Sequence, residues 1–232
     1  MSHSQQGPNL IQITRLGFVN AYLVREDDGF TLVDTCIAGS AKAILAAAQT
    51  AGAPIRRLTV THAHADHVGS VDSLASRLGD IEIAYPERDA RIMAGDRSLD
   101  PEEAGPPLRG LRAASFGDVK TPPTRTLAPG DRVGSLEVIP APGHTPGQIA
   151  FSDTRDGTLL CADVYATLLG PVTSAKPTVR SPLPGVGTWH RPPALESAHR
   201  LRALDPSRLA PGHGKVVDSP AAVMDRALAT TS

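Results

Sequence analysis

A histidine-rich segment constrains this chain more than any other feature of its sequence. Residues 62–67 read His-Ala-His-Ala-Asp-His and follow directly on an apolar stretch with the character of a strand. Positions two apart on an extended strand end point the same way, so His62 and His64 can reach one point in space. Asp66 and His67, at the start of the next helix, can reach a neighbouring point. Imidazole and carboxylate are ligands of zinc, iron and manganese, so the segment indicates a metal site.

Three later positions lie in a similar local context, at a strand end followed by a turn. They are His144 in a Pro-Gly-His-Thr-Pro-Gly loop, Asp163 in an Ala-Asp pair, and His213 in a Pro-Gly-His-Gly loop. Each has an ordinary alternative when taken alone, since either histidine can lie on the surface and Asp163 can cap a helix. With the earlier donors they are enough for two ions. The candidate ligands are therefore His62, His64, Asp66, His67, His144, Asp163 and His213.

The rest of the chain alternates between predicted strands and predicted helices. Strands are predicted at Leu10–Leu16, Val19–Val24, Phe30–Val33, Arg57–Thr61, Ile81–Tyr85, Thr126–Leu127, Arg132–Val133, Leu136–Pro140, Gln148–Phe151, Thr158–Cys161 and Arg208–Ala210. Helices are predicted at Ser40–Ala51, Val68–Leu78, Pro86–Ala94, Pro193–Ala203 and Pro220–Ala229. Residues 95–123 and 170–193 are rich in Pro and are expected to form irregular insertion or lid loops. Two β-rich halves covered by helices favour one domain, 1–232, with two sheets inside and helices outside.

Composition and charge reduce the classes of binding partner to be expected. The net charge of -1 gives no electrostatic reason to expect binding to nucleic acid or to an anionic membrane. The apolar runs are too short to cross a bilayer, and the polar N-terminus lacks a secretory leader, so a cytoplasmic location is expected. Cys36 and Cys161 lie in apolar runs and are interpreted as small buried hydrophobes rather than as a disulfide pair. The expected partner is a small-molecule substrate, and the oligomeric state, dimer or otherwise, is left open.

The motifs resemble those of the metallo-β-lactamase-fold hydrolases. The resemblance rests on the 62–67 segment, on the loops around His144, Asp163 and His213, and on the opening stretches Asn20–Val24 and Leu32–Thr35. It covers nearly the whole chain in the right order. It implies an α/β fold, a four-layer αββα sandwich of two mixed sheets flanked by helices, with the metals in a cleft at one edge of the sheets.

The resemblance also implies a division of the ligands between two ions. The first would be held by His62, His64 and His144, the second by Asp66, His67 and His213, with Asp163 bridging them. Asp34 matches a family acid that supports the site from behind, and it can equally cap the helix that follows. The ions are expected to be zinc, with iron or manganese as alternatives.

A paired metal centre predicts hydrolysis. Two divalent cations that share a water lower its pKa towards neutrality, and the resulting hydroxide attacks a carbonyl or phosphorus. Asp66 is expected to orient that hydroxide. The bridging carboxylate at Asp163 is similar to that of glyoxalase II (hydroxyacylglutathione hydrolase) and of acyl-homoserine lactonases, which implies a small carbonyl ester, lactone or thioester as substrate. The alternatives are a sulfur dioxygenase with a single iron, a β-lactam hydrolase, and a metal-bound binding module without turnover.

Four further residues are candidates for substrate contact. The lactonases use a Tyr three residues after the bridging Asp, whereas Tyr165 stands two residues after Asp163 and can instead pack beneath the loop. Arg180, Trp189 and His190 lie in the 170–193 segment, where they can contact a substrate or simply belong to a surface loop.

Overall fold

The first half of the chain forms a mixed β-sheet in the computed structural model, which describes residues 1–109, 114–176, 178–179 and 183–229. Within these residues the sheet has seven strands in chain order, antiparallel from β1 to β4 and parallel from β4 to β7. They are β1 (Ser2–Gln5), β2 (Leu10–Arg15), β3 (Val19–Glu26), β4 (Gly29–Val33), β5 (Ile55–Thr59), β6 (Glu82–Pro86) and β7 (Arg125–Leu127).

The second half contributes a second mixed sheet. Its strand order is β15-β14-β11-β10-β9-β8 in the described part of the chain, with β11 and β14 parallel and the other pairs antiparallel. The strands are β8 (Arg132–Val133), β9 (Leu136–Pro140), β10 (Ile149–Asp153), β11 (Thr158–Ala162), β14 (Arg208–Pro211) and β15 (Val217–Asp218). A separate hairpin joins β12 (Tyr165–Ala166) to β13 (Val172–Thr173).

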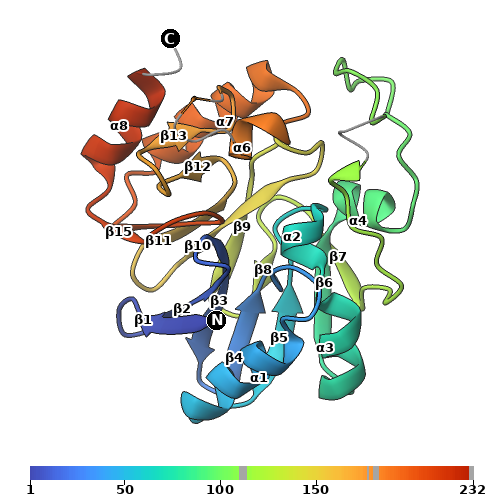
Figure 1. Ribbon diagram of the computed structural model, residues 1–232, viewed down its shortest axis with the longest axis vertical. Helices are drawn as coiled ribbons and strands as arrows, with labels where there is room; N and C mark the ends of the chain where they lie inside the picture. Colours follow the sequence, from blue (N-terminus) through green and yellow to red (C-terminus); the bar gives the residue numbers. More distant parts are fainter. Residues whose placement is uncertain (110–113, 177, 180–182, 230–232) are drawn as a thin grey trace.

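Helices cover the outer face of each sheet (Figure 1). The first sheet carries α1 (Ala41–Thr50), α2 (Ala65–Val68), α3 (Val71–Leu78) and α4 (Glu87–Met93), and the second half carries α6 (Leu183–Val186), α7 (Arg191–Ala203) and α8 (Ala221–Ala229). Three apolar clusters fill the spaces between layers. One joins the first sheet to its helices, one joins the two sheets through residues such as Tyr22 and Phe151, and one joins the second sheet to Leu201 and Met224. The predicted four-layer αββα sandwich is therefore confirmed.

Several elements differ from the sequence prediction. The polar residues of β1 were not predicted as a strand, because all of them are exposed and only backbone pairing with β2 holds them in the sheet. The predicted helix Val68–Leu78 is broken at Gly69, where a Cβ would lie 2.5 Å from the backbone nitrogen of Ala38. The predicted irregular segment 170–193 contains β13 and α6, and no helix in the described residues has the length and apolar character of a membrane span.

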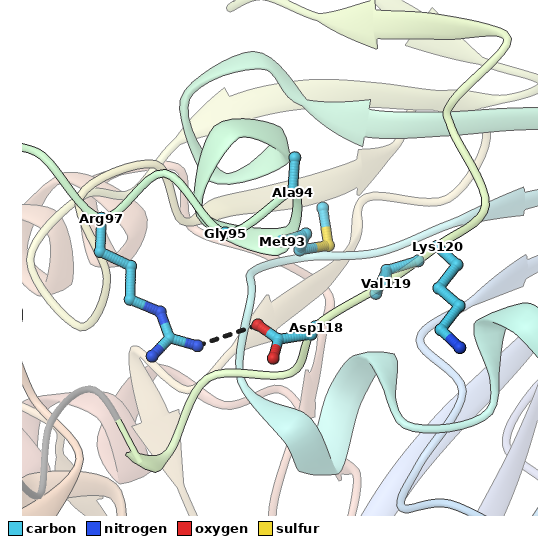
Figure 2. A pocket seen from close by; sticks show the side chains of 7 residues that line it. All are labelled: Met93, Ala94, Gly95, Arg97, Asp118, Val119 and Lys120. Carbon is cyan, nitrogen blue, oxygen red and sulfur yellow. Dashed lines mark hydrogen bonds and ion pairs between the residues drawn. The ribbon is translucent and has the colours of Figure 1, made fainter.

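The 95–123 segment is fastened to the sandwich at several points. Arg88 of α4 pairs with Glu103, with Nε 2.6 Å from Oε1. Arg97 pairs with Asp118 at 3.0 Å, which joins the two ends of the segment across an open pocket of about 500 Å³ (Figure 2). Phe116 forms a backbone bridge with His64, the second histidine of the 62–67 segment. These contacts place the insertion beside the candidate ligands.

Candidate metal centre

Strand direction brings the candidate ligands to one edge of the sandwich. The 62–67 segment follows β5, and Asp163 and His213 follow the parallel pair β11 and β14. The carboxyl ends of parallel strands meet at the same edge of a sheet. His144 follows β9, which runs in the direction of β11 because two antiparallel steps separate them. The hydrogen bond from the Ile149 backbone N–H to the Thr61 carbonyl, at 3.0 Å, joins the two sheets at this edge.

Three buried histidines form the first donor group. His62 Nε2 lies 3.2 Å from His64 Nδ1, and the ring of His144 lies 5.1 Å from that of His62 and 4.6 Å from that of His64. The candidate donor nitrogens of these three side chains lie within 4.8 Å of one another. The group is therefore compact enough for one ion.

Asp66, His67 and His213 form the second donor group, again within 4.8 Å. His213 Nε2 lies 3.4 Å from Asp66 Oδ2. Asp163 lies between the two groups: its Oδ2 is 3.3 Å from His144 Nε2 and 3.1 Å from His213 Nε2, and its Oδ1 is 3.4 Å from His67 Nε2. The structure thus brings all seven sequence-predicted ligands together, and their division between two ions remains our proposal.

Outer hydrogen bonds fix which ring nitrogen faces the centre in His62, His67, His144 and His213. His67 Nδ1 donates to Asp34 Oδ2 at 2.8 Å, and His62 Nδ1 lies 3.0 Å from Thr61 Oγ1, which itself donates to Asp34. Asp34 therefore holds one histidine of each group, the supporting role that the family resemblance implies. Such partners set the tautomer and orientation of metal-binding histidines.

The remaining two orienting contacts come from residues that the sequence did not mark as candidates. His144 Nδ1 donates to Thr188 Oγ1 at 3.0 Å, and Thr188 donates in turn to the Ser174 carbonyl. His213 Nδ1 donates to the Phe18 carbonyl at 3.2 Å. Thr188 and Phe18 carry no motif that marks them, so only the fold reveals these roles.

Buried atoms without partners show that the side chains fit a bound cation. His67 Nε2, His144 Nε2 and Asp163 Oδ1 are buried, have no hydrogen-bond partner and belong to the facing donor groups. A buried polar atom left unsatisfied costs about 1–3 kcal/mol. A metal ion accepts electron pairs from each of these atoms and removes that cost. Asp163 also needs space next to it, since a Cβ at Gly212 would lie 2.1 Å from its Oδ1.

The histidines of the centre differ in pKa, according to whether imidazoles or carboxylates surround them. Burial and the neighbouring imidazoles hold the pKa of His62 and that of His64 well below the ordinary value, so both rings are neutral and able to bind metal. Burial also acts to lower the pKa of His67, but the carboxylates of Asp34 and Asp163 outweigh it and raise that pKa well above the ordinary value. The His67 imidazole therefore binds a proton more tightly than the imidazoles of His62 and His64.

A pocket of about 230 Å³ opens onto the donors. Phe18, Ser115, Val186 and Gly187 line it together with five of the candidate ligands. Val186 is 70% exposed and Phe18 is half-buried, so apolar side chains form part of the rim. Asp66, whose side chain is 34% exposed, is the most accessible carboxylate of the centre. A small molecule that enters the pocket thus meets an apolar rim and then the donor groups.

The other candidate substrate contacts lie elsewhere. The Tyr165 hydroxyl is buried and donates to the Ala198 carbonyl at 2.6 Å, so it packs beneath helix α7, the alternative that the sequence analysis kept open. Trp189 is 6% exposed and its Nε1 donates to the Pro106 carbonyl at 2.7 Å, which ties the two irregular segments together. The His190 ring meets the Trp189 ring edge to face, with centroids 5.4 Å apart, at the start of α7. Arg180 lies outside the described residues.

Known proteins share both the sequence pattern and the fold. The metallo-β-lactamase superfamily model matches residues 14–213. An uncharacterized Bacillus subtilis protein, YobT, is 40% identical over 210 residues, which cover 90% of this chain and 89% of that protein. A hydroxyacylglutathione hydrolase of Xanthomonas euvesicatoria is 33% identical over 146 residues, and this match spans 63% of the chain but only 46% of that enzyme.

A solved structure carries the same arrangement of elements. The protein TTHA1623, solved in a di-iron-bound form, superposes with a TM-score of 0.65 at 28% identity and covers 90% of this chain and 94% of its own. The family match extends from the second strand to the last candidate ligand, His213, and so includes every donor described above. The chain therefore belongs to the metallo-β-lactamase superfamily and is a metal-dependent hydrolase.

Proposed function

We propose that this enzyme uses two divalent metal ions, most simply zinc, to hydrolyse a small carbonyl ester, lactone or thioester. One observation carries the proposal: seven donors converge in overlapping groups of three, and the carboxylate of Asp163 lies within 3.4 Å of His67, His144 and His213. A site for a single ion needs only three or four donors. Seven converging donors are accounted for when two ions bind side by side.

Different residues of the chain have different roles in the proposed reaction. Bound metal ions supply a nucleophile at neutral pH and polarise the carbonyl that is attacked. Asp66 belongs to the second donor group and lines the pocket, where it is placed to accept a hydrogen bond from the nucleophile and to orient it. Asp34 and Thr188 hold the imidazoles of His67 and His144 in fixed orientations.

The pocket favours a small substrate with an apolar portion. Its volume of about 230 Å³ lies below the usual range of roughly 300–1,000 Å³ for sites of drug-sized ligands. Phe18 and Val186 offer apolar contact at the rim, and Ser115 offers a hydroxyl. The thioester chemistry named for the Xanthomonas relative supports the carbonyl class, while the short shared segment leaves the thiol portion undetermined.

Metal quantification combined with a substrate panel tests this proposal. Protein purified without added metal should contain two zinc equivalents and should hydrolyse at least one of a set of lactones, thioesters and aryl esters. About one iron and no zinc, with oxidation of a persulfide instead of hydrolysis, would establish the dioxygenase alternative. The di-iron form of TTHA1623 makes iron a necessary part of the metal analysis. Two bound ions without turnover on any compound would favour a binding module.

A further inference from the structure

A second buried carboxylate, Asp89, lies in α4 outside the set of candidate ligands. It is fully buried, yet its three recorded hydrogen bonds all come from loops rather than from its own helix. Burial raises the pKa of Asp89, while these three donors act to lower it. A buried acid held by several donors in this way is costly to maintain unless it organises its surroundings.

Both loops that carry the first donor group bond to Asp89. Its Oδ2 accepts the Ala63 backbone N–H at 2.8 Å and the Thr145 hydroxyl at 2.6 Å, and its Oδ1 accepts the Gly147 N–H at 2.7 Å. Ala63 stands between His62 and His64, and Thr145 follows His144. One carboxylate thus fixes the backbone next to every ligand of that group.

The close approach of the second loop to Asp89 requires a glycine. A Cβ at Gly147 would lie 2.6 Å from the Asp89 backbone nitrogen and 2.7 Å from its Oδ1, both far inside van der Waals contact. The Pro-Gly-His-Thr-Pro-Gly loop therefore sits directly on the start of α4. Its last glycine serves this contact with Asp89.

The second donor group rests on other supports. His67 bonds to Asp34, His213 bonds to the Phe18 carbonyl, and no hydrogen bond of the described residues joins Asp66, His67 or His213 to Asp89. Asp34 also reaches His62 through Thr61, whereas the hydrogen bonds to Asp89 come from Ala63 and Thr145, the sequence neighbours of first-group ligands, and from Gly147. A change at Asp89 should disturb the first group and spare the second.

From this geometry we infer that Asp89 is a positioning residue for the first metal ion, and that it sets the affinity of the His62, His64 and His144 group alone. The inference rests on the proposed two-metal function. In Asp89→Asn the new NH2 group must face the N–H of either Ala63 or Gly147, so two donors oppose each other in both orientations of the amide. The loops should then separate, and the three imidazoles should converge less well.

Zinc and cobalt binding to Asp89→Asn tests the inference. Equilibrium dialysis against buffered zinc should resolve two binding steps in the parent protein. In the variant one step should weaken about 10- to 100-fold while the other stays within about twofold. His144→Ala, which removes a ligand of the first group, identifies the affected step. When each variant holds one cobalt ion, their absorption spectra should match.

Asp72 offers a matched control because it accepts the same kinds of donor. Its carboxylate receives the backbone N–H groups of Lys120 and Thr121 and the Thr121 hydroxyl, and neither residue adjoins a candidate ligand in the sequence. Asp72→Asn should bind both ions as the parent does. If Asp89→Asn fails to fold by circular dichroism, Thr145→Val removes a single donor and should still weaken the same step several-fold.

The outcomes separate this inference from the proposed function. A folded Asp89→Asn protein, or a folded Thr145→Val protein in its place, with both steps unchanged overturns the inference. Equal weakening of both steps also overturns it, because the effect is then not confined to the first group. A parent protein that holds fewer than two ions overturns the two-metal function, and the inference with it.

Discussion

At the scale of single residues, the turns that present the ligands adopt backbone conformations that most side chains avoid. Asp34 has φ of 62° and Ala162, directly before Asp163, has φ of 50°. A non-glycine residue in the left-handed region costs roughly 1–2 kcal/mol, and such residues cluster at functional sites. In this chain two such residues lie at turns whose carboxylates contact histidines of the centre, and Leu16, Cys36, Asp205 and Ser219 also have positive φ.

Replacing Asp66 tests its role in orienting the nucleophile. Asp66→Ala should lower kcat/KM by at least about 10²-fold, since a displacement of about 1 Å in a reacting group can cost that much. It should also weaken the second ion, because it removes one of the donors next to His213. The free energy of unfolding of the metal-free protein should change by under about 0.5 kcal/mol, since the carboxylate is partly exposed. His190→Ala should leave metal content unchanged, and full activity in Asp66→Ala would show that the role is wrong.

The two cysteines give a prediction from their pKa values. Burial raises the pKa of the Cys36 thiol to about 12, and it raises that of Cys161 further. A raised pKa keeps the thiol protonated at neutral pH, and the thiolate is the reactive form. Neither thiol should react with Ellman's reagent in native protein at pH 8, and both should react after denaturation. Rapid labelling of the native protein would contradict their burial.

At the scale of elements, the irregular segments are joined to each other as well as to the sandwich. Trp189 is the only tryptophan in the sequence, and it packs on Gly105 while its backbone N–H donates to the His144 carbonyl. From the sequence, Trp189 was a candidate substrate contact. In the structure it connects residues 105–106 to the loop of His144. The rim of the pocket therefore depends on a contact that is distant in sequence.

Truncating this side chain should loosen both segments. Trp189→Ala should lower the free energy of unfolding by about 3 kcal/mol, as expected for a buried aromatic residue, and should expose residues 98–109 to limited proteolysis. Trp189→Phe keeps the ring but loses the hydrogen bond to Pro106 and should cost about 1 kcal/mol. An unchanged cleavage pattern in Trp189→Ala would show that the segments are held by other contacts.

The elements that sequence reasoning found share a property that the missed ones lack. Strands such as β3 and β4 carry runs of buried apolar residues, and these runs are visible in the sequence. Strand β1 has no buried residue, and the break between α2 and α3 at Gly69 follows from the approach of the Ala38 backbone, which comes from a distant turn. Pattern reasoning detects burial along one segment, and it does not detect pairing or packing between segments.

At the scale of the whole molecule, the same distinction governs the site. All seven candidate ligands were evident from residue type and strand ends, because metal chemistry limits the side chains that can serve. Their supports were not evident: Asp34 was marked by the family resemblance, whereas Thr188 and Asp89 reach the centre only through tertiary contacts. The ligands can therefore be identified from the local sequence, whereas the contacts that orient them can be identified only from the folded structure.

Metal binding should stabilise the entire domain. An ion that binds only the folded state adds about 2.7 kcal/mol when its free concentration is 100 times the dissociation constant. For a chain of this size that corresponds to a rise in Tm of roughly 5–10 °C for each ion. Calorimetric scans of chelator-treated protein with and without added zinc measure this rise. Addition of magnesium serves as the control, because it favours oxygen ligands and should produce little shift.

The division of the ligands between the two sheets has a consequence for synthesis of the protein. The 62–67 segment leaves the ribosome well before β14 and His213 exist, so a nascent chain carries three histidines and an aspartate with no partners from the second sheet. Neither donor group is complete until the C-terminal half has been translated and has docked. We therefore expect a full set of ions to bind only after the two halves of the chain have assembled.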